Sequence, residues 1–216
     1  MTEFSLCGFS CRAERIGAEP AALVLLFSGA DEKLFGDVCG ILAAEKRSLV
    51  LAEFGPVDWD NDYTPWAADA SGGRHFGGGA GRLAGFLPIF TAALAERFGE
   101  FSGVYHCGYS LGGLFALYTA CADEQVCGAA SCSGSMWYPG WTDFLAAHPM
   151  HGRIYLSLGG KEKNAADPLM ASIEDKTAEV KRIVARTAEV SFVQERGGHF
   201  SRIPERIARG ILWLLS

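Results

Sequence analysis

The sequence predicts an α/β fold, with a doubly wound, mostly parallel sheet and helices on both of its faces. Segments with a strand pattern alternate with segments at helical spacing, which is typical of this class. The early run Ala21–Phe27 is continuously apolar, as in a strand buried on both faces. The 216 residues, 49% of them hydrophobic, are enough to bury one sizeable core. We expect a single domain over residues 1–216, since no repeat or linker divides the chain.

The remaining elements follow this first strand in order. Apolar residues in 34–44 recur at helical spacing, and 48–53 returns to a strand pattern before a long irregular stretch at 55–81. Beyond that stretch, strands are expected at 103–107, 128–133, 153–158 and 189–194, and helices at about 82–98, 114–120, 173–186 and 204–215. Such alternation favours parallel strands whose connecting helices cover both faces of the sheet.

One strand-to-helix turn carries a chemical motif. Residues 108–112 have the sequence G-Y-S-L-G, which matches G-x-S-x-G between a predicted strand and a predicted helix. A nucleophile elbow needs this context, because its strained turn exposes a serine hydroxyl while the flanking glycines let the chain pass close to itself. A helix N-terminus also favours the negative charge that develops during attack on an ester. A glycine-rich turn without chemistry is the alternative, but the context favours Ser110 as a nucleophile.

A serine nucleophile needs a general base, and five histidines compete for this role. His199 alone follows a late strand and precedes the terminal helix, at the sheet edge where doubly wound folds gather their site residues. It also fits the chain order of nucleophile, acid and histidine. His106 lies within a predicted strand, whereas His75, His148 and His151 lie in connections. We therefore expect His199 to be the general base.

The acid is expected between the nucleophile and the histidine, just beyond the strand at 153–158. Glu162 is nearest to the end of that strand and is our choice. Asp167 also qualifies by chain order, as do Glu174 and Asp175 in or near the following helix. The alternative for Glu162 is a solvated loop carboxylate.

An oxyanion formed at the site would need two backbone donors. The N–H of Leu111, which follows the nucleophile, is expected to be one of them. The second is expected from the turn that ends the first strand, at Gly29 or Ala30.

Composition and charge exclude several classes of partner. The net charge of −6, without a basic run, argues against binding of nucleic acid or an anionic membrane, and the apolar runs are too short to span a bilayer. Seven cysteines, an odd number without C-x-x-C pairing, and a start without a signal-peptide pattern favour a cytoplasmic protein with no metal site. No cofactor is expected, and the oligomeric state is left open.

The irregular stretch 55–81 is longer than a passive connection usually is, so we expect it to serve the site. Residues 79–84 match G-x-G-x-x-A, but no strand feeds directly into the match and no phosphate-loop lysine is present, so nucleotide binding is a weak alternative. Five residues are candidates for binding substrate, with packing of the loops as an equal alternative: Asp62, Tyr63, Trp66, Met136 and Trp137.

Several motifs, in order along the chain, resemble an esterase family of the α/β-hydrolase superfamily that includes ferric-enterobactin esterases. D-Y-T-P at 62–65 resembles the family's D-[YFL]-T-P, and S-G-S-M-W-Y at 133–138 resembles S-P-S-[LM]-W-[WY], with Gly134 in place of the proline. The resemblance extends from Leu23 over most of the chain and includes the segments 77–87, 108–116, 197–200 and 210–215.

This resemblance implies an α/β-hydrolase fold and hydrolysis of a small ester through a covalent acyl intermediate on Ser110. A thioesterase or an amide-cleaving hydrolase of the same fold is one alternative, and a non-catalytic binding module with this fold is another. Because the segment before Leu23 is short, we expect one or two outer strands to be reduced, and we expect no inserted lid domain. Some members of the family work with a serine and histidine pair, which leaves a Ser110 and His199 dyad open.

Overall fold

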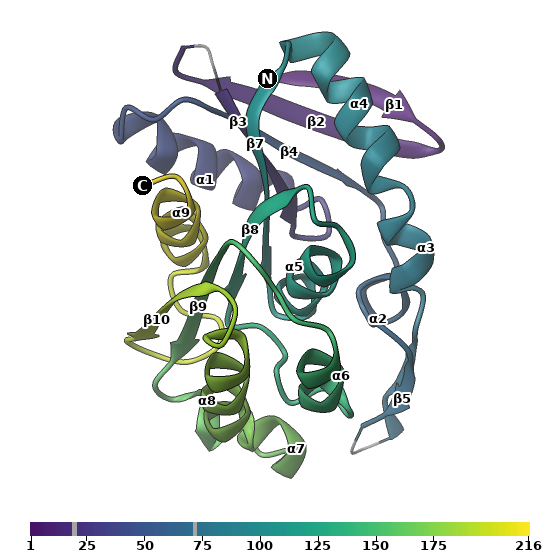
Figure 1. Cartoon of the computed structure of the whole chain (residues 1–216), viewed down its shortest axis with the longest axis vertical. Helices are drawn as coiled ribbons and strands as arrows, with labels where there is room; N and C mark the ends of the chain where they lie inside the picture. Colours follow the sequence, from purple (N-terminus) through teal and green to yellow (C-terminus); the bar gives the residue numbers. More distant parts are fainter. Residues whose placement is uncertain (19–20, 71–72) are drawn as a thin grey trace.

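The computed structural model describes residues 1–18, 21–70 and 73–216. In these residues the main sheet has eight strands in the order β1-β2-β4-β3-β7-β8-β9-β10, with β1 and β2 at the top of Figure 1 and β10 at the lower left. Within this order β4, β3, β7, β8, β9 and β10 are parallel to one another, whereas β2 is antiparallel to β1 and β4. Their bounds are β1 Thr2–Leu6, β2 Phe9–Ile16, β3 Ala21–Phe27, β4 Leu49–Gly55, β7 Phe101–Tyr109, β8 Val126–Cys132, β9 Arg153–Gly159 and β10 Glu189–Glu195.

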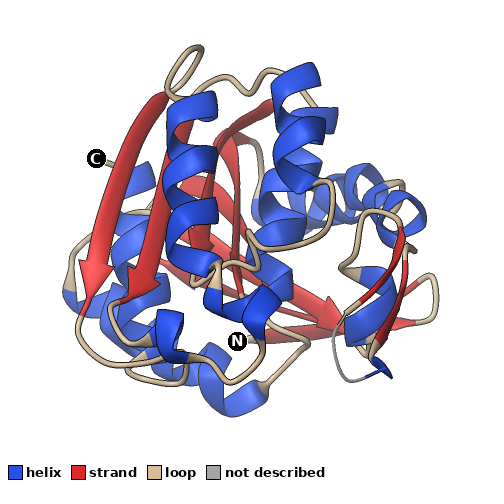
Figure 2. Cartoon of the chain, turned by 90° about the horizontal axis from the view of Figure 1, so that it is seen from below, coloured by secondary structure: helices blue, strands red, loops and turns tan. Residues whose placement is uncertain are grey.

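Helices cover both faces of this sheet, as the sequence predicted (Figure 2). On one face α1 (Glu32–Ala44) and α9 (Ile203–Leu214) bury their apolar sides together. The other face carries α3 (Ala80–Ala84), α4 (Leu87–Phe98), α5 (Leu111–Ala122), α6 (Trp141–Ala147) and α8 (Ile173–Val184). In the part of the chain that the structure describes, no helix has the length and apolar character needed to cross a membrane.

The expectation of reduced outer strands is wrong, because β1 and β2 form a complete antiparallel pair at the edge of the sheet. The positions of β1 are exposed or half-buried, β2 buries only Cys11, Ala13 and Ile16, and β2 carries charged residues such as Arg12 and Glu14. Such strands lack the continuous apolar run of a strand buried on both faces, so the apolar pattern does not reveal them.

The helix expected at about 82–98 is divided into α3 and α4. Gly85 ends α3, and Pro88 stands in the first turn of α4. Proline has no N–H and its ring clashes with the carbonyl four residues earlier, so the helix stops before Pro88 and begins again.

The stretch 55–81 is more ordered than the sequence predicted, although residues 71–72 within it lie outside the described residues. It contains α2 (Trp59–Asp62) and the hairpin of β5 (Ala67–Asp69) and β6 (His75–Gly77). A Cβ on Gly77 or on Gly79 would overlap the Asn61 side chain. Close packing against Asn61 therefore accounts for Gly79, the first glycine of the nucleotide-binding match at 79–84, and for Gly77 just before it.

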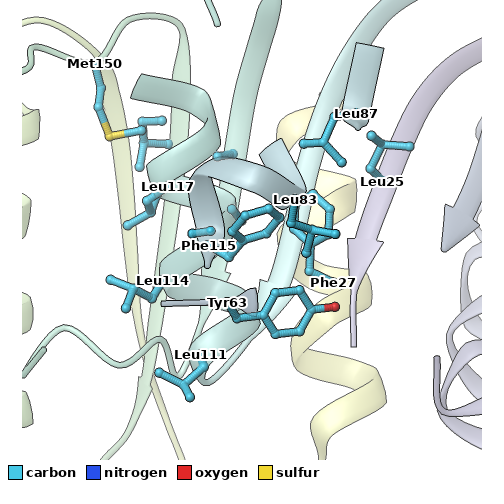
Figure 3. Close-up of a cluster of buried hydrophobic side chains, with 14 of the residues drawn as sticks. Leu25, Phe27, Tyr63, Leu83, Leu87, Leu111, Leu114, Phe115, Leu117 and Met150 are labelled. Atoms are coloured by element: carbon cyan, nitrogen blue, oxygen red, sulfur yellow. The ribbon is translucent and has the colours of Figure 1, made fainter. Parts of the chain in front are cut away.

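The core under α5 fixes the position of the strand-to-helix turn (Figure 3). The ring of Phe27 packs edge-on against that of Phe115 at 4.7 Å, and Tyr63 lies beside both. Leu111 and Leu114, from the first turn of α5, are buried in the same cluster. The start of α5 is therefore held by packing on the end of β3.

Candidate active site

The turn between β7 and α5 has the geometry of a nucleophile elbow. Ser110 has φ 57° and ψ −122°, which is a strained conformation for a residue with a side chain. A Cβ on Gly108 would overlap the carbonyl of Gly112, and a Cβ on Gly112 would overlap the carbonyl of Phe27. Only glycine fits at these two positions, which explains the spacing of the motif.

The structure brings Ser110, His199 and Glu162 together. His199 follows β10, and its Nε2 lies 3.1 Å from the Oγ of Ser110. Glu162 begins the 3₁₀ helix η2 (Glu162–Asn164) after β9, and its Oε2 lies 2.7 Å from the Nδ1 of His199. Asp167, the alternative acid, instead caps α7 (Pro168–Ala171) by accepting the N–H groups of Leu169 and Met170.

The Glu162 carboxylate is buried and held by hydrogen bonds, unlike the solvated loop carboxylate considered as an alternative. Its side chain is 4% exposed, and its Oε1 accepts from Ser133 Oγ at 2.7 Å and from Gly159 N–H at 2.6 Å. Burial by itself would raise the pKa of Glu162, but the hydrogen bonds from His199, Ser133 and Gly159 hold it below its ordinary value. The carboxylate is therefore ionised and ready to accept from His199.

Arg206 belongs to this cluster, and our sequence analysis missed it. Its guanidinium is 1% exposed and donates to Ser133 Oγ at 2.6 Å and to the Gly198 carbonyl at 3.0 Å. The signal in the sequence was an arginine on the apolar side of the terminal helix, between Ile203 and Ile207. An arginine in that position is rarely buried unless it has a partner.

A cavity of about 530 Å³ opens beside Ser110 and His199. Its walls are mostly apolar and come from Trp59, Trp137, Met170, Ile173, Phe200 and Ile203. The ring of Phe200 is edge-on to His199 at 5.0 Å and is 84% exposed, so it stands at the mouth. Arg74 also lines the cavity, where it is paired with Asp60.

Trp137 is the one candidate for substrate binding that lines this cavity among the described residues. Asp62 instead forms an ion pair with Arg82 at 2.7 Å and accepts the N–H of Asp58. The structure thus gives Asp62 a role in closing the turn of α2.

The other three candidates also pack the protein rather than face the cavity. Tyr63 lies in the core beside Phe27, and Met136 is buried in the same cluster. Trp66 donates from its indole N–H to the carbonyl of Pro139 at 2.9 Å. Aromatic and apolar loop residues can pack within the protein instead of against a ligand. This packing alternative describes Tyr63, Met136 and Trp66 here.

The predicted oxyanion donors differ in their surroundings. Leu111 lines the cavity and is the first residue of α5, where a backbone N–H has no partner within the helix. The N–H of Gly29 points to the Tyr63 hydroxyl at 3.3 Å, and neither Gly29 nor Ala30 lines the cavity among the described residues. A Cβ on Gly29 would approach the ring of Trp59 to 3.2 Å, so this turn lies directly behind a wall of the cavity.

A buried carboxyl group on the neighbouring strand β4 contacts the same turn. Glu53 on β4 accepts from the hydroxyl of Ser28, the residue before Gly29, and lies 3.4 Å from the Arg12 guanidinium. Burial raises the pKa of Glu53 from 4.5 to about 7, although the Ser28 and Arg12 contacts act against this shift.

We expect Glu53 to make stability fall as pH rises. Between pH 4.5 and about 7 the folded protein keeps a proton that the unfolded chain has lost, so the stabilisation is complete below this window and is lost through it. The loss amounts to at most about 3 kcal/mol. The free energy of unfolding of Glu53→Gln, measured by urea titration at several pH values, should therefore increase relative to that of the wild type as pH rises. Parallel pH profiles would contradict the assignment, and Glu3→Gln on the exposed edge strand is the matched control.

No group of three or more histidine, cysteine or acidic side chains in residues 1–18, 21–70 and 73–216 is placed to hold a metal ion.

No family model matches the sequence, and no curated protein matches it. Solved structures do match. The siderophore hydrolase EstB from Aspergillus nidulans has a TM-score of 0.81 at 17% identity, with 99% of this chain and 93% of that chain covered. EstA, a siderophore hydrolase from the same organism, has a TM-score of 0.76 at 18% identity, with coverages of 95% and 89%. An IroE-like serine hydrolase from Shewanella oneidensis has a TM-score of 0.76 at 13% identity, with coverages of 95% and 80%.

These likenesses, together with the mostly parallel eight-stranded sheet, show that the chain has the α/β-hydrolase fold. The resemblance seen in the sequence motifs is thereby confirmed at the level of the fold.

Proposed function

We propose that the protein is a serine esterase that cleaves a small-molecule ester through a covalent acyl intermediate on Ser110. The observation that carries the proposal is the continuous hydrogen-bonded chain from Ser110 Oγ through His199 to Glu162, with distances of 3.1 and 2.7 Å. Nucleophile, base and orienting acid in this arrangement define an acyl-transfer site. The names of the structures with this fold, two siderophore hydrolases and a serine hydrolase, support the proposal.

The proposed mechanism uses each side chain once in each half of the reaction. His199 Nε2 takes the proton of Ser110 as Oγ bonds to the acyl carbon, and it then gives that proton to the departing alcohol. Glu162 keeps the Nδ1 proton of His199 in place and stabilises the imidazolium. Water next attacks the acyl carbon, gives its proton to His199 and releases the acid, while Ser110 takes the proton back.

The Leu111 N–H and the turn at Gly29 and Ala30 are the proposed donors to the oxyanion. Losing one such donor typically lowers kcat by about 100-fold to 1000-fold. The burial of Glu162 supports a triad rather than a Ser110 and His199 dyad. The apolar cavity, with Trp137 in its wall, supports a small ester as the substrate.

Two alternatives use the same site differently. A thioesterase or an amide-cleaving hydrolase would use the same acyl intermediate with another leaving group. A non-catalytic binding module would have no use for a strained Ser110 with a base at 3.1 Å, so the geometry favours an enzyme.

Covalent labelling tests the proposal. A fluorophosphonate probe should modify Ser110, located by peptide mapping, and a panel of esters and thioesters of graded chain length should show turnover of the esters. Faster cleavage of the matched thioesters would support the thioesterase. Binding of an ester without labelling or turnover would establish the binding module and refute the proposal.

Glu162→Gln should keep the fold and lower kcat by about four powers of ten, the effect of losing a fully engaged triad carboxylate. Asp167→Asn should change kcat little, because Asp167 caps α7 and does not contact His199. Initial rates of both variants on one activated ester test this directly. A more damaging Asp167→Asn would show that the acid is misassigned, and two active variants would indicate a dyad.

The proposal includes a cytoplasmic location. It also includes no need for a cofactor or metal and no binding to nucleic acid or membrane. The net charge of −6 and the seven cysteines without a pairing pattern support these expectations.

A further inference from the structure

The structure buries a permanent positive charge behind the candidate active site. Arg206 lies on α9, and its side chain is 1% exposed. A guanidinium keeps its charge in a protein, and a buried charge needs partners to be tolerated. A buried ion pair often stabilises a fold little, so its partners are a better guide to its role.

Among the described residues, the hydrogen-bond partners of the Arg206 side chain all belong to segments that carry the site. Its Nη1 donates to Ser133 Oγ at 2.6 Å and lies 3.3 Å from Glu162 Oε1. Its Nη2 donates to the carbonyl of Gly198 at 3.0 Å, and Gly198 is the residue before His199. The planar fork of one guanidinium therefore joins the acid segment to the histidine segment.

These contacts also divide the two oxygens of the Glu162 carboxylate. Oε1 receives Ser133 Oγ, Gly159 N–H and the Arg206 guanidinium, whereas Oε2 receives His199 Nδ1. With Oε1 fully engaged, rotation of the carboxylate would break several hydrogen bonds at once. Oε2 is consequently held toward His199.

We propose that Arg206 is a positioning residue that aligns Glu162 and His199 with Ser110. The inference rests on the proposed function, because alignment matters only if His199 acts on Ser110. Arg206 itself touches neither Ser110 nor the His199 ring in the described contacts, so it acts through its partners.

Arg206→Met tests this role by removing the charge and the fork while keeping a long side chain. We expect kcat for an activated ester to fall by about 100-fold, the scale of a small misplacement of catalytic groups, with KM nearly unchanged. The downfield NMR resonance of the His199 Nδ1 proton, which reports its hydrogen bond to Glu162 without any turnover, should shift or disappear. Arg209→Met is the matched control, because Arg209 is on the same helix but pairs with Glu195 at the surface.

Arg206→Lys separates charge from geometry and serves as the test if the methionine variant does not fold. A lysine keeps the charge, but its single ammonium group cannot reproduce the fork. We expect kcat about 10-fold below that of the wild type, with KM unchanged and a displaced Nδ1 resonance. Wild-type kcat in either folded variant, or a lower kcat with an unmoved resonance, would overturn the positioning role.

The two proposals fail in different ways. If the wild type is not labelled by a fluorophosphonate and turns over no ester, the proposed function fails. If the wild type is labelled and active while the folded Arg206 variants match it in kcat and resonance, the function stands and the positioning role fails.

Discussion

Ser110→Ala is expected to lower kcat for an activated short-chain ester by about six powers of ten, the loss seen when a catalytic serine is removed from a triad. The hydroxyl is the only group removed, and no other described residue lies within hydrogen-bonding reach of it except His199. The fold should therefore remain intact. Initial rates measured beside the midpoint of thermal unfolding check both parts of this expectation.

Ser102→Ala is the matched control, since Ser102 is exposed at the far end of the same strand, β7. It should leave both the rate and the unfolding midpoint unchanged. Wild-type activity in Ser110→Ala would remove the elbow from the mechanism, and the acyl intermediate with it.

His199→Ala should lose kcat to a similar extent, about six powers of ten, because among the described residues no other base lies within reach of Ser110. Two other histidines provide controls on the same assay. His75 is exposed and lies 2.8 Å from Asp69, and His148 stacks on Phe144. His75→Ala and His148→Ala should both remain active. If the His75 variant is inactive and the His199 variant is active, the base is His75, and our assignment of His199 is wrong.

Most of the sheet could be predicted because its inner strands are buried on both faces. The bounds expected for β3, residues 21–27, agree with those observed. The edge strands β1 and β2 could not be found in this way, since their solvent-facing positions dilute the apolar pattern. The break between α3 and α4 was foreseeable from Pro88, which the helical spacing of the surrounding residues concealed.

The proximity of Ser110, His199 and Glu162 could be predicted from chain order and from the strand ends, because both are properties of the backbone topology. The contacts of Arg206 could not, because they depend on how α9 packs behind two loops. Tyr63 and Trp66 show the opposite difficulty. Their aromatic side chains are suitable for binding a substrate, and the sequence alone does not distinguish a cavity wall from a loop core.

The close approach of Gly112 to the carbonyl of Phe27 means that the site is assembled when the chain folds, before a substrate binds. Because Gly112 has no side chain, the end of β3 lies directly against the first turn of α5. The turn at Gly29 and the turn at Ser110, which are far apart in the sequence, therefore keep a fixed separation. Repulsion between filled electron shells sets this spacing, and it does not depend on a bound molecule. The entropy lost in bringing the Ser110 turn and the turn at Gly29 together is therefore lost when the chain folds. An arriving ester would meet groups already in register, and its binding free energy would not be needed to align them.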